Sequence, residues 1–392
     1  MTKRNLASAV LIVGMGLTSC QSTSSTHSPK IYHAQPSGIG SQSSRTAPDT
    51  RVARATSPRY IPPASPKFTT PAEPSRYIPM QSQPIVLPGE KLIVSKTKPP
   101  SYSKKVNGTE WVSLERWGKL HKGWYGRIQK GNHTIHRLVV SGMRFDMLPK
   151  RRLITCQGMQ IWMGFGPQII GGNLFVHHLD IKKHLAPLAA GMPGLGRIAV
   201  IDAGHGKDNQ GTRSVYNKAY EKDYVLDWAL RLKPLLERKG WRVFLTRTGD
   251  KSMSLTERVK FADKVKASLF ISLHLNAASR PVRGLETYCI APVGMPSHFT
   301  RGNPDPVGSK LPNNPWDAAS FQLAARVHNQ VLLKCRMTDR GVRRVRFMSV
   351  IKGQKRPAIL VEGGYLSNPT EAQKIDQKAY RQKLAEGIAA AL

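Results

Sequence analysis

Residues 197–392 alternate short apolar runs with amphipathic helical stretches, and no other feature of the chain constrains its fold as strongly. The apolar runs are residues 198–203, 243–246, 269–273, 285–290 and 358–361. The helical stretches are residues 221–239, 255–266, 316–334 and 380–392. Strands that are apolar on both faces lie between two layers of helices, as in parallel sheets. The pattern therefore predicts an α/β domain with a mostly parallel sheet covered by helices on both faces.

Local signals mark two helix starts in this region and argue against a long helix in residues 291–315. Ser254 followed by Glu257 fits a capping box, and Asn368 followed by Pro369 fits the start of a short helix. Residues 291–315 contain six prolines, each of which removes a helical N–H and clashes with the preceding turn. We expect no long helix there, so a site beside this segment should be open.

Four side chains that can bind a metal or move a proton stand at the ends of these elements. His205 follows the first apolar run, His274 closes the third, and Glu362 follows the last. Glu221 opens the first helix, where it could simply favour the helix N-terminus. Sites in such sheets form at the carboxyl ends of the strands, and two histidines with one carboxylate and an open fourth position make a catalytic zinc set. Each residue alone is more often structural, but their joint placement favours a metal site.

Five longer stretches make this interpretation specific. In chain order they read DAGHGKDNQGT, YEKDYVLDWALRLKPLLERKGWRVFLTRTGD, SLTERVKFADKVKASLFISLHLNAA, GLETY and PAILVEGGYLSNPTEAQKI. With these motifs, residues 197–392 resemble the zinc-dependent N-acetylmuramoyl-L-alanine amidases of the type 3 family. The resemblance implies that His205, Glu221 and His274 bind Zn²⁺ and that Glu362 is the catalytic carboxylate.

The resemblance also implies a reaction. It is hydrolysis of the amide between N-acetylmuramic acid and L-alanine of the peptidoglycan stem peptide, for wall remodelling or daughter-cell separation. Asn276 and Glu286 lie in matching motifs, and we assign them no contact with the metal. Two alternatives remain: a related zinc peptidase that cuts within the stem peptide, and a non-catalytic wall-binding lipoprotein.

The N-terminus has the pattern of an export signal. Lys3 and Arg4 precede an apolar run over residues 6–17, which is too short to span a bilayer at about 20 residues. The run ends in LTSC, which resembles a bacterial lipobox with Cys20 as the lipid-anchored residue; an ordinary signal peptide with an incidental cysteine is the alternative. Gln21 is not the aspartate associated with inner-membrane retention. We therefore expect residues 1–20 to direct export and anchoring to the outer membrane, facing the periplasm.

Residues 21–90 separate this signal from the folded part of the chain. They hold 12 of the 28 prolines and show neither helical nor strand periodicity. Such a composition buries too little apolar surface to offset the entropy of ordering, which predicts a disordered linker.

Residues 91–190 predict a small α+β domain. Short β-rich runs at 137–145, 152–163 and 173–177 lie between a helical pattern at 114–120 and another at 179–188. The stretch WVSLERWGKL, followed by GMQIWMGFGPQIIGGNLFVHHLDIKKHLAPL, resembles the copper-amine-oxidase N-terminal-like domain, which implies no copper site here. We expect no metal at His177, His178 and His184, because adjacent strand side chains face opposite ways. We expect the aromatic residues of this region to lie mostly in its core: Trp111, Trp117, Trp124 and Tyr125.

The net charge of +36 implies a polyanionic neighbour. We expect no nucleic-acid partner, because the chain carries no recognisable nucleic-acid recognition motif. The charge is densest in residues 91–190, with 17 basic and 4 acidic residues, so this region is a candidate for holding anionic envelope polymers. Its deletion should abolish binding to the sacculus if that is so. The oligomeric state is not indicated by the sequence.

The cysteines and a basic run near the C-terminus lead to two more expectations. Cys156, Cys289 and Cys335 show no CxxC spacing, so buried free thiols are expected, with one disulfide plus one free thiol as the alternative. A run of basic residues flanks the last apolar run and predicts a solvated face or a surface that attracts carboxylates: Arg336, Arg340, Arg343, Arg344, Arg346, Lys352, Lys355 and Arg356.

Overall fold

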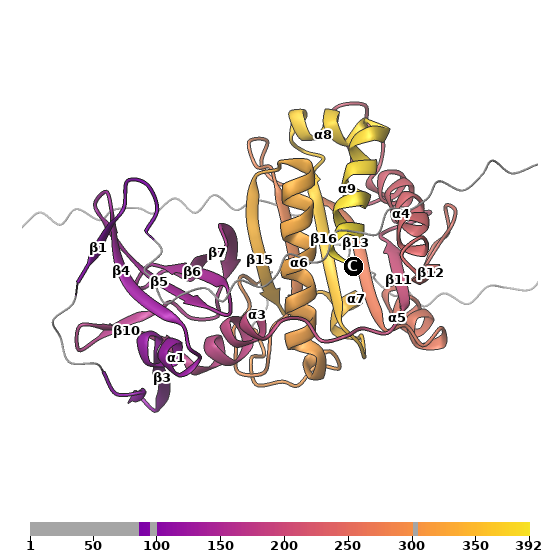
Figure 1. Cartoon of the computed structure of the whole chain (residues 1–392). Helices are drawn as coiled ribbons and strands as arrows, with labels where there is room; N and C mark the ends of the chain where they lie inside the picture. Colours follow the sequence, from indigo (N-terminus) through magenta and orange to yellow (C-terminus); the bar gives the residue numbers. More distant parts are fainter. Residues whose placement is uncertain (1–85, 95–99, 301–304) are drawn as a thin grey trace, which may run out of the picture. The chain divides into compact units, whose positions relative to one another are not determined.

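The computed structural model describes residues 86–94, 100–300 and 305–392. The expected signal peptide and most of the expected linker lie outside these described residues. Within them, no helix is long and apolar enough to cross a membrane. The strands form one sheet of twelve strands and a second sheet of four (Figure 1).

The C-terminal half of the large sheet has the order β15-β14-β16-β13-β11-β12. Strands β12, β11, β13 and β16 run parallel, β14 is antiparallel to β16, and β15 is parallel to β14. This confirms the expected α/β class with a mostly parallel sheet. The bounds are β11 (Ile198–Ala203), β12 (Arg242–Leu245), β13 (Leu269–Asn276), β14 (Leu285–Ile290), β15 (Asp339–Val345) and β16 (Ala358–Tyr365).

Helices cover both faces of this half, as expected. On one face, Ala199 and Ile201 pack in a core with α4 (Glu221–Glu237), α6 (Asp317–Cys335) and α9 (Lys378–Ala391), and Figure 1 shows these helices over the strands. On the other face, Val200 and Phe270 pack in a smaller core with α5 (Leu255–Lys264) and α7 (Ser349–Lys352). Alternate residues of one strand thus face opposite layers, which explains why the strands are apolar throughout.

The expected helix starts are present. Ser254 and Glu257 form a reciprocal capping box at α5. Asn368 accepts a hydrogen bond from the backbone N–H of Glu371 at the start of α8 (Pro369–Asp376). The described residues between β14 and the 3₁₀ turn Asn314–Trp316 contain no helix, in agreement with their proline content.

The described residues between 86 and 190 form the N-terminal half of the large sheet and the whole four-stranded sheet. The N-terminal half of the large sheet contains β1 (Lys91–Ile93), β4 (Trp124–Lys130), β5 (His133–Val140), β6 (Met143–Met147), β7 (Leu153–Cys156) and β8 (Met159–Trp162). The four-stranded sheet contains β2 (Ser103–Val106), β3 (Thr109–Ser113), β10 (Asn173–His177) and β9 (Gln168–Ile170). The helical parts are α1 (Leu114–Leu120), α2 (His178–Asp180), a π-helical turn (Ile181–Leu185) and α3 (Ala186–Ala190).

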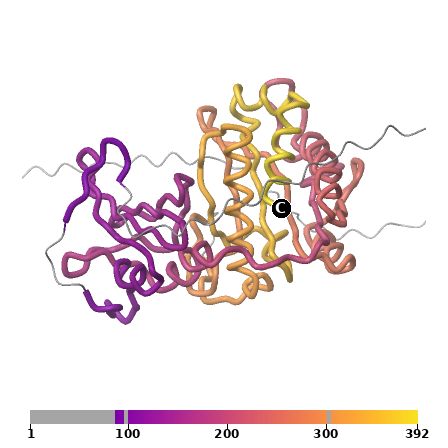
Figure 2. The backbone as a smooth tube through the Cα atoms, in the orientation of Figure 1, coloured from indigo at the N-terminus to yellow at the C-terminus, as the bar shows by residue number. Residues whose placement is uncertain are grey.

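The two halves of the large sheet meet at β8 and β15, which pair in parallel through Ile161 and Val342. After α3 the chain runs along α6, where the Gln322 amide donates to the carbonyl oxygens of Pro187 and Gly191. Figure 2 traces this segment from α3 to β11. The proposed boundary between residues 190 and 197 therefore falls within a segment packed against α6.

Strand β15 was not among the expected strands. It lies in the basic run, in which four arginines are buried and not solvated: Arg343, Arg344, Arg346 and Arg356. Hydrogen bonds explain how the burial of Arg344 is tolerated. The Arg344 guanidinium donates to the carbonyl oxygens of Ile290 and Lys183 at 2.8 and 2.6 Å. The solvated-face interpretation is therefore wrong for these four arginines.

The remaining expectations concern cysteines and aromatic residues. The three described cysteines are free thiols; Cys156 and Cys289 are buried and Cys335 is half-buried. Trp111 and Trp117 are buried in the core. His177 stacks on Phe165 with ring centroids 3.6 Å apart, so its ring is used in packing.

Candidate metal centre and catalytic site

Three of the four site residues converge at the carboxyl ends of the parallel strands. His205 follows β11, His274 lies near the end of β13, and Glu221 is the first residue of α4. Oε1 of Glu221 lies 3.0 Å from Nε2 of His205 and 3.0 Å from Nδ1 of His274. In the described part of the chain this is the one group of His, Cys, Asp or Glu side chains that could hold a metal ion, and its ligand atoms lie within 4.8 Å of one another.

Glu221 is buried and held as a carboxylate. Its Oε1 accepts the backbone N–H of Leu275 at 2.9 Å, and its Oε2 accepts that of Thr212 at 3.0 Å. Burial by itself would raise the pKa of Glu221, but hydrogen bonds and charge from the two histidines outweigh it and hold the pKa well below its usual range. A charged carboxylate at this position is ready to bind a cation.

The loop that carries His205 adopts a conformation that needs support. His205 has a φ of +61°, in the left-handed region that costs energy for residues other than glycine. Arg258 donates to the His205 carbonyl oxygen at 2.6 Å, and Arg247 donates to the Gly204 carbonyl oxygen at 2.8 Å. A Cβ atom at Gly204 would collide with the His274 ring, so this position requires glycine. The sequence indicated neither arginine; both belong to motifs that follow β12 and begin α5.

The donor set fits a zinc ion. Nδ1 of His205 lies 2.7 Å from Oδ1 of Asn209, which directs Nε2 towards Glu221 and His274. Such a second hydrogen bond on the far nitrogen is typical of metal-binding histidines. Nitrogen and oxygen donors in a set of three also match catalytic zinc sites, which leave one position open.

Glu362 lies beside this centre without belonging to the convergent three. It is a half-buried residue of β16, and in the sheet register it stands directly opposite His274 of β13. Side chains of directly paired strand residues point to the same face. The structure thus brings together all four residues that the sequence singled out. A small pocket of about 160 Å³ adjoins the two histidines and is lined by His205, His274 and Ser254.

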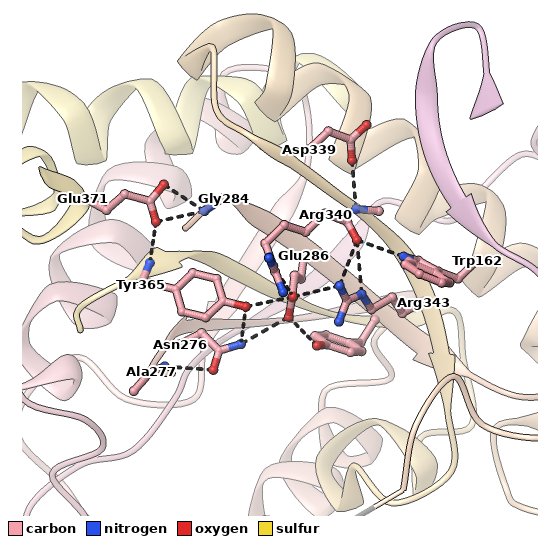
Figure 3. A network of polar contacts seen from close by, with 12 residues as sticks. Trp162, Asn276, Ala277, Gly284, Glu286, Asp339, Arg340, Arg343, Tyr365 and Glu371 are labelled. Atoms are coloured by element: carbon pink, nitrogen blue, oxygen red, sulfur yellow. Dashed lines mark hydrogen bonds and ion pairs between the residues drawn. The ribbon is translucent and has the colours of Figure 1, made fainter. Parts of the chain in front are cut away.

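The sequence did not indicate the network that continues from Glu362 along the sheet. Glu286 of β14 is the register partner of Glu362 on its other side. Figure 3 shows how polar side chains surround the Glu286 carboxylate. Its Oε1 accepts from Arg340 Nε at 2.7 Å and Tyr365 Oη at 2.8 Å and lies 3.0 Å from Arg343 Nη2, while its Oε2 accepts from Asn276 Nδ2 at 3.2 Å and from Tyr288 Oη.

Electrostatics keep Glu286 charged although it is almost fully buried. Burial would raise its pKa, but Arg343 and the hydrogen bonds of Tyr288, Arg340 and Tyr365 lower the pKa below its usual value. The signals that could have revealed this network were the GLETY motif and the arginines of the basic run, which proved to be adjacent strands.

Comparison with known proteins identifies the family of the C-terminal domain. The family model described as N-acetylmuramoyl-L-alanine amidase matches residues 199–392. An uncharacterized protein, YqiI of Bacillus subtilis (strain 168), is 31% identical over 205 residues, which cover 52% of this chain and 87% of YqiI. The N-acetylmuramoyl-L-alanine amidase LytC of the same organism is 33% identical over 50% of this chain and 35% of LytC. AmiC, an N-acetylmuramoyl-L-alanine amidase of Escherichia coli O6:H1, is 31% identical over 54% of this chain and 57% of AmiC.

Among solved structures, the catalytic domain of CwlV, an N-acetylmuramoyl-L-alanine amidase from Bacillus (Paenibacillus) polymyxa var. colistinus, is 31% identical. The match covers 50% of this chain and 96% of that domain, with a TM-score of 0.42. The chain therefore spans most of YqiI but about a third of LytC and just over half of AmiC. Through residues 199–392, the chain belongs to the N-acetylmuramoyl-L-alanine amidase family.

Proposed function

We propose that the protein is a zinc-dependent peptidoglycan hydrolase that cuts the amide between N-acetylmuramic acid and L-alanine of the stem peptide. The observation that carries this proposal is the convergence of His205, Glu221 and His274 on one point with Glu362 in register beside His274. Family membership supports the choice of bond, since relatives with this catalytic domain bear the name N-acetylmuramoyl-L-alanine amidase.

His205, Glu221 and His274 would hold the zinc ion. Bound there, zinc would polarise the scissile carbonyl and lower the pKa of the attacking water towards neutrality. Glu362, which is not needed as a ligand, would take the proton of the attacking water and deliver it to the nitrogen of the departing L-alanine. The Glu221 carboxylate, fixed by the backbone N–H groups of Leu275 and Thr212, would keep the two imidazoles oriented.

The test is digestion of purified sacculi followed by mass analysis of the muropeptides. The proposal expects intact stem peptides and sugar strands without peptide. Shortened stems would indicate a zinc peptidase that cuts within the stem, and no products would indicate a wall-binding protein without catalysis. Glu362→Gln should retain zinc, measured by elemental analysis, and lose about 10²- to 10⁴-fold in rate, the usual contribution of a general acid–base group. Full activity in this variant would remove Glu362 from the mechanism.

We further propose that the protein is exported and anchored through a lipid on Cys20 to the outer membrane, with residues 21–90 as the linker. Residues 91–190 would form a domain of the copper-amine-oxidase N-terminal-like class that holds anionic envelope polymers. The exposed side chains of Lys104, Lys105 and Lys122 lie in this region. Replacement of the three by glutamine should weaken binding to sacculi at low salt, while unchanged binding would remove this role.

A further inference from the structure

A row of polar side chains extends from the metal centre across the sheet. His274 on β13, Glu362 on β16 and Glu286 on β14 are direct register partners, and Arg340 on the next strand, β15, donates to Glu286. Adjacent strands lie about 4.8 Å apart, so Glu286 is about 10 Å from the position of His274 along this row. The row ends at Trp162 of β8, whose indole N–H donates to the Arg340 carbonyl oxygen at 3.1 Å.

The far end of this row presents a partly exposed guanidinium group. Two guanidinium groups, those of Arg340 and Arg343, meet the single carboxylate of Glu286. The Glu286 side chain is 2% exposed and that of Arg343 10%, whereas that of Arg340 is 31% exposed. Arg340 is thus the more exposed of two cations that share the Glu286 carboxylate.

The Arg340 side chain is held in place before any ligand binds. Its Nε donates to Glu286, and its guanidinium lies over the Tyr365 ring at 5.4 Å. Its carbonyl oxygen accepts from Trp162 Nε1 and from both Nε and Nη2 of Arg343. A preorganised guanidinium loses less side-chain entropy when it binds a ligand, and its planar fork matches a carboxylate.

The chemistry of the substrate decides which part of it would meet this cation. In the amide proposed to be cut, the lactyl carboxyl of N-acetylmuramic acid is consumed in the bond itself, and the N-acetyl sugars carry no other carboxylate. Free carboxylates lie on the peptide side alone. The Arg340 guanidinium contacts Glu286 and so lies about 10 Å from the metal centre along the row. An extended peptide rises about 3.3 Å per residue, so the part of the stem peptide that reaches Arg340 is the second or third residue beyond the scissile amide.

We propose that Arg340 is a specificity-determining residue that binds a stem-peptide carboxylate two or three residues beyond the amide that is cut. Glu286 and Tyr365 are positioning residues that fix its guanidinium. This inference rests on the proposed function, and it narrows the role of the basic run from general attraction to one contact.

The test uses the full chain and two synthetic N-acetylmuramyl tripeptides that differ in one respect. In one the stem carboxylates are free acids, and in the other they are primary amides. Wild type should favour the acid by about 10-fold or more in kcat/KM, mainly through KM, which is the effect expected for a hydrogen bond to a charged group. Arg340→Gln should bring the ratio of acid to amide close to one. The matched control is Arg336→Gln, an exposed arginine at the end of α6, which should keep the wild-type ratio.

Several results would overturn the inference. Equal losses on both substrates in Arg340→Gln would mean that Arg340 only supports the fold of the site. A wild-type enzyme that does not distinguish acid from amide would exclude the contact whatever the variant does. Competition in wild type by the free acid tripeptide but not by its amide is expected as well, and it needs no variant to fold. Cleavage of neither compound by wild type would instead refute the proposed function, and the inference with it.

Discussion

Two histidine–carboxylate clusters in different parts of the molecule show how similar side chains serve different ends. In the region of residues 86–190, Asp180 and His184 are fully buried and bonded through Nδ1 at 2.9 Å. In the C-terminal region, Oε1 of Glu221 lies 3.0 Å from a ring nitrogen of His205 and 3.0 Å from one of His274, and both histidines are partly exposed. The pairing alone therefore does not distinguish a structural cluster from a metal centre.

The difference lies in what occupies the remaining polar atoms. The Asp180 oxygens accept the backbone N–H groups of Gly164 and Phe165, and Nε2 of His184 lies 3.1 Å from Nε of Arg344. Each polar group of that cluster is thus committed to a fixed partner within the protein. Burial lowers the pKa of His184, so the ring is neutral and can accept from Arg344. Around Glu221, in contrast, one oxygen and two ring nitrogens converge on a shared point that a cation could occupy.

The sharpest way to break this comparison is to remove the charge of each carboxylate in turn. Glu221→Gln should lose bound zinc and at least about 10²-fold in amidase activity, because the ligand set is reduced to two imidazoles. Metal content after dialysis and the rate of muropeptide release measure the two effects. Retention of stoichiometric zinc by Glu221→Gln would show that the convergent group is not the metal centre.

Asp180→Asn is the matched control, since it makes the same chemical change in the buried cluster. It should leave the zinc content per folded molecule unchanged and instead lower the free energy of unfolding by about 3 kcal/mol, because it leaves buried partners uncompensated. Urea unfolding measures this loss. If Asp180→Asn removed zinc while the fold remained intact, the division between the two clusters would not hold.

A smaller effect follows from histidines of the N-terminal region that are held neutral. Burial lowers the pKa of His136 to about 4 and that of His177 to about 4. Because these values lie below about 6.5, the value for an unfolded chain, their contribution to stability is complete above pH 6.5 and is lost as the pH falls towards 4. The free energy of unfolding should therefore decrease over this window, by on the order of 2 kcal/mol for His136.

His136→Gln should flatten this pH dependence, while His133→Gln, an exposed position on the same strand, should not. Urea unfolding at pH 7.5 and pH 4.5 compares the variants. An equal loss of stability between these pH values in wild type and His136→Gln would assign the acid sensitivity to other groups.

The sequence predicted those parts of the molecule that rest on apolar periodicity and local caps. Strands β11 and β14 have the expected bounds, and the Ser254 and Asn368 caps are present. Strand β15 was missed because its buried positions hold arginines, whose burial depends on carbonyl oxygens and a carboxylate that are distant in the chain. Local pattern carries no information on such partners.

Some residues of the candidate site could be predicted from local sequence pattern, and others could not. The two histidines and Glu362 lie at or near the ends of apolar strands, so their placement at one edge of the sheet followed from its parallel topology. The arginines that hold the His205 loop, Arg247 and Arg258, and the network around Glu286 depend on side chains that cross between elements. Their roles become visible only when the strand order is known.

The pairing of β8 with β15 also determines which strand edges are open to other chains. An unpaired edge can pair with another polypeptide and start aggregation. Because β8 occupies one side of β15, β12 is the only strand of the C-terminal half at an end of the described sheet. That strand is four residues long and begins with an exposed arginine, features that discourage such association. The N-terminal region thus shields the catalytic fold from unwanted strand addition.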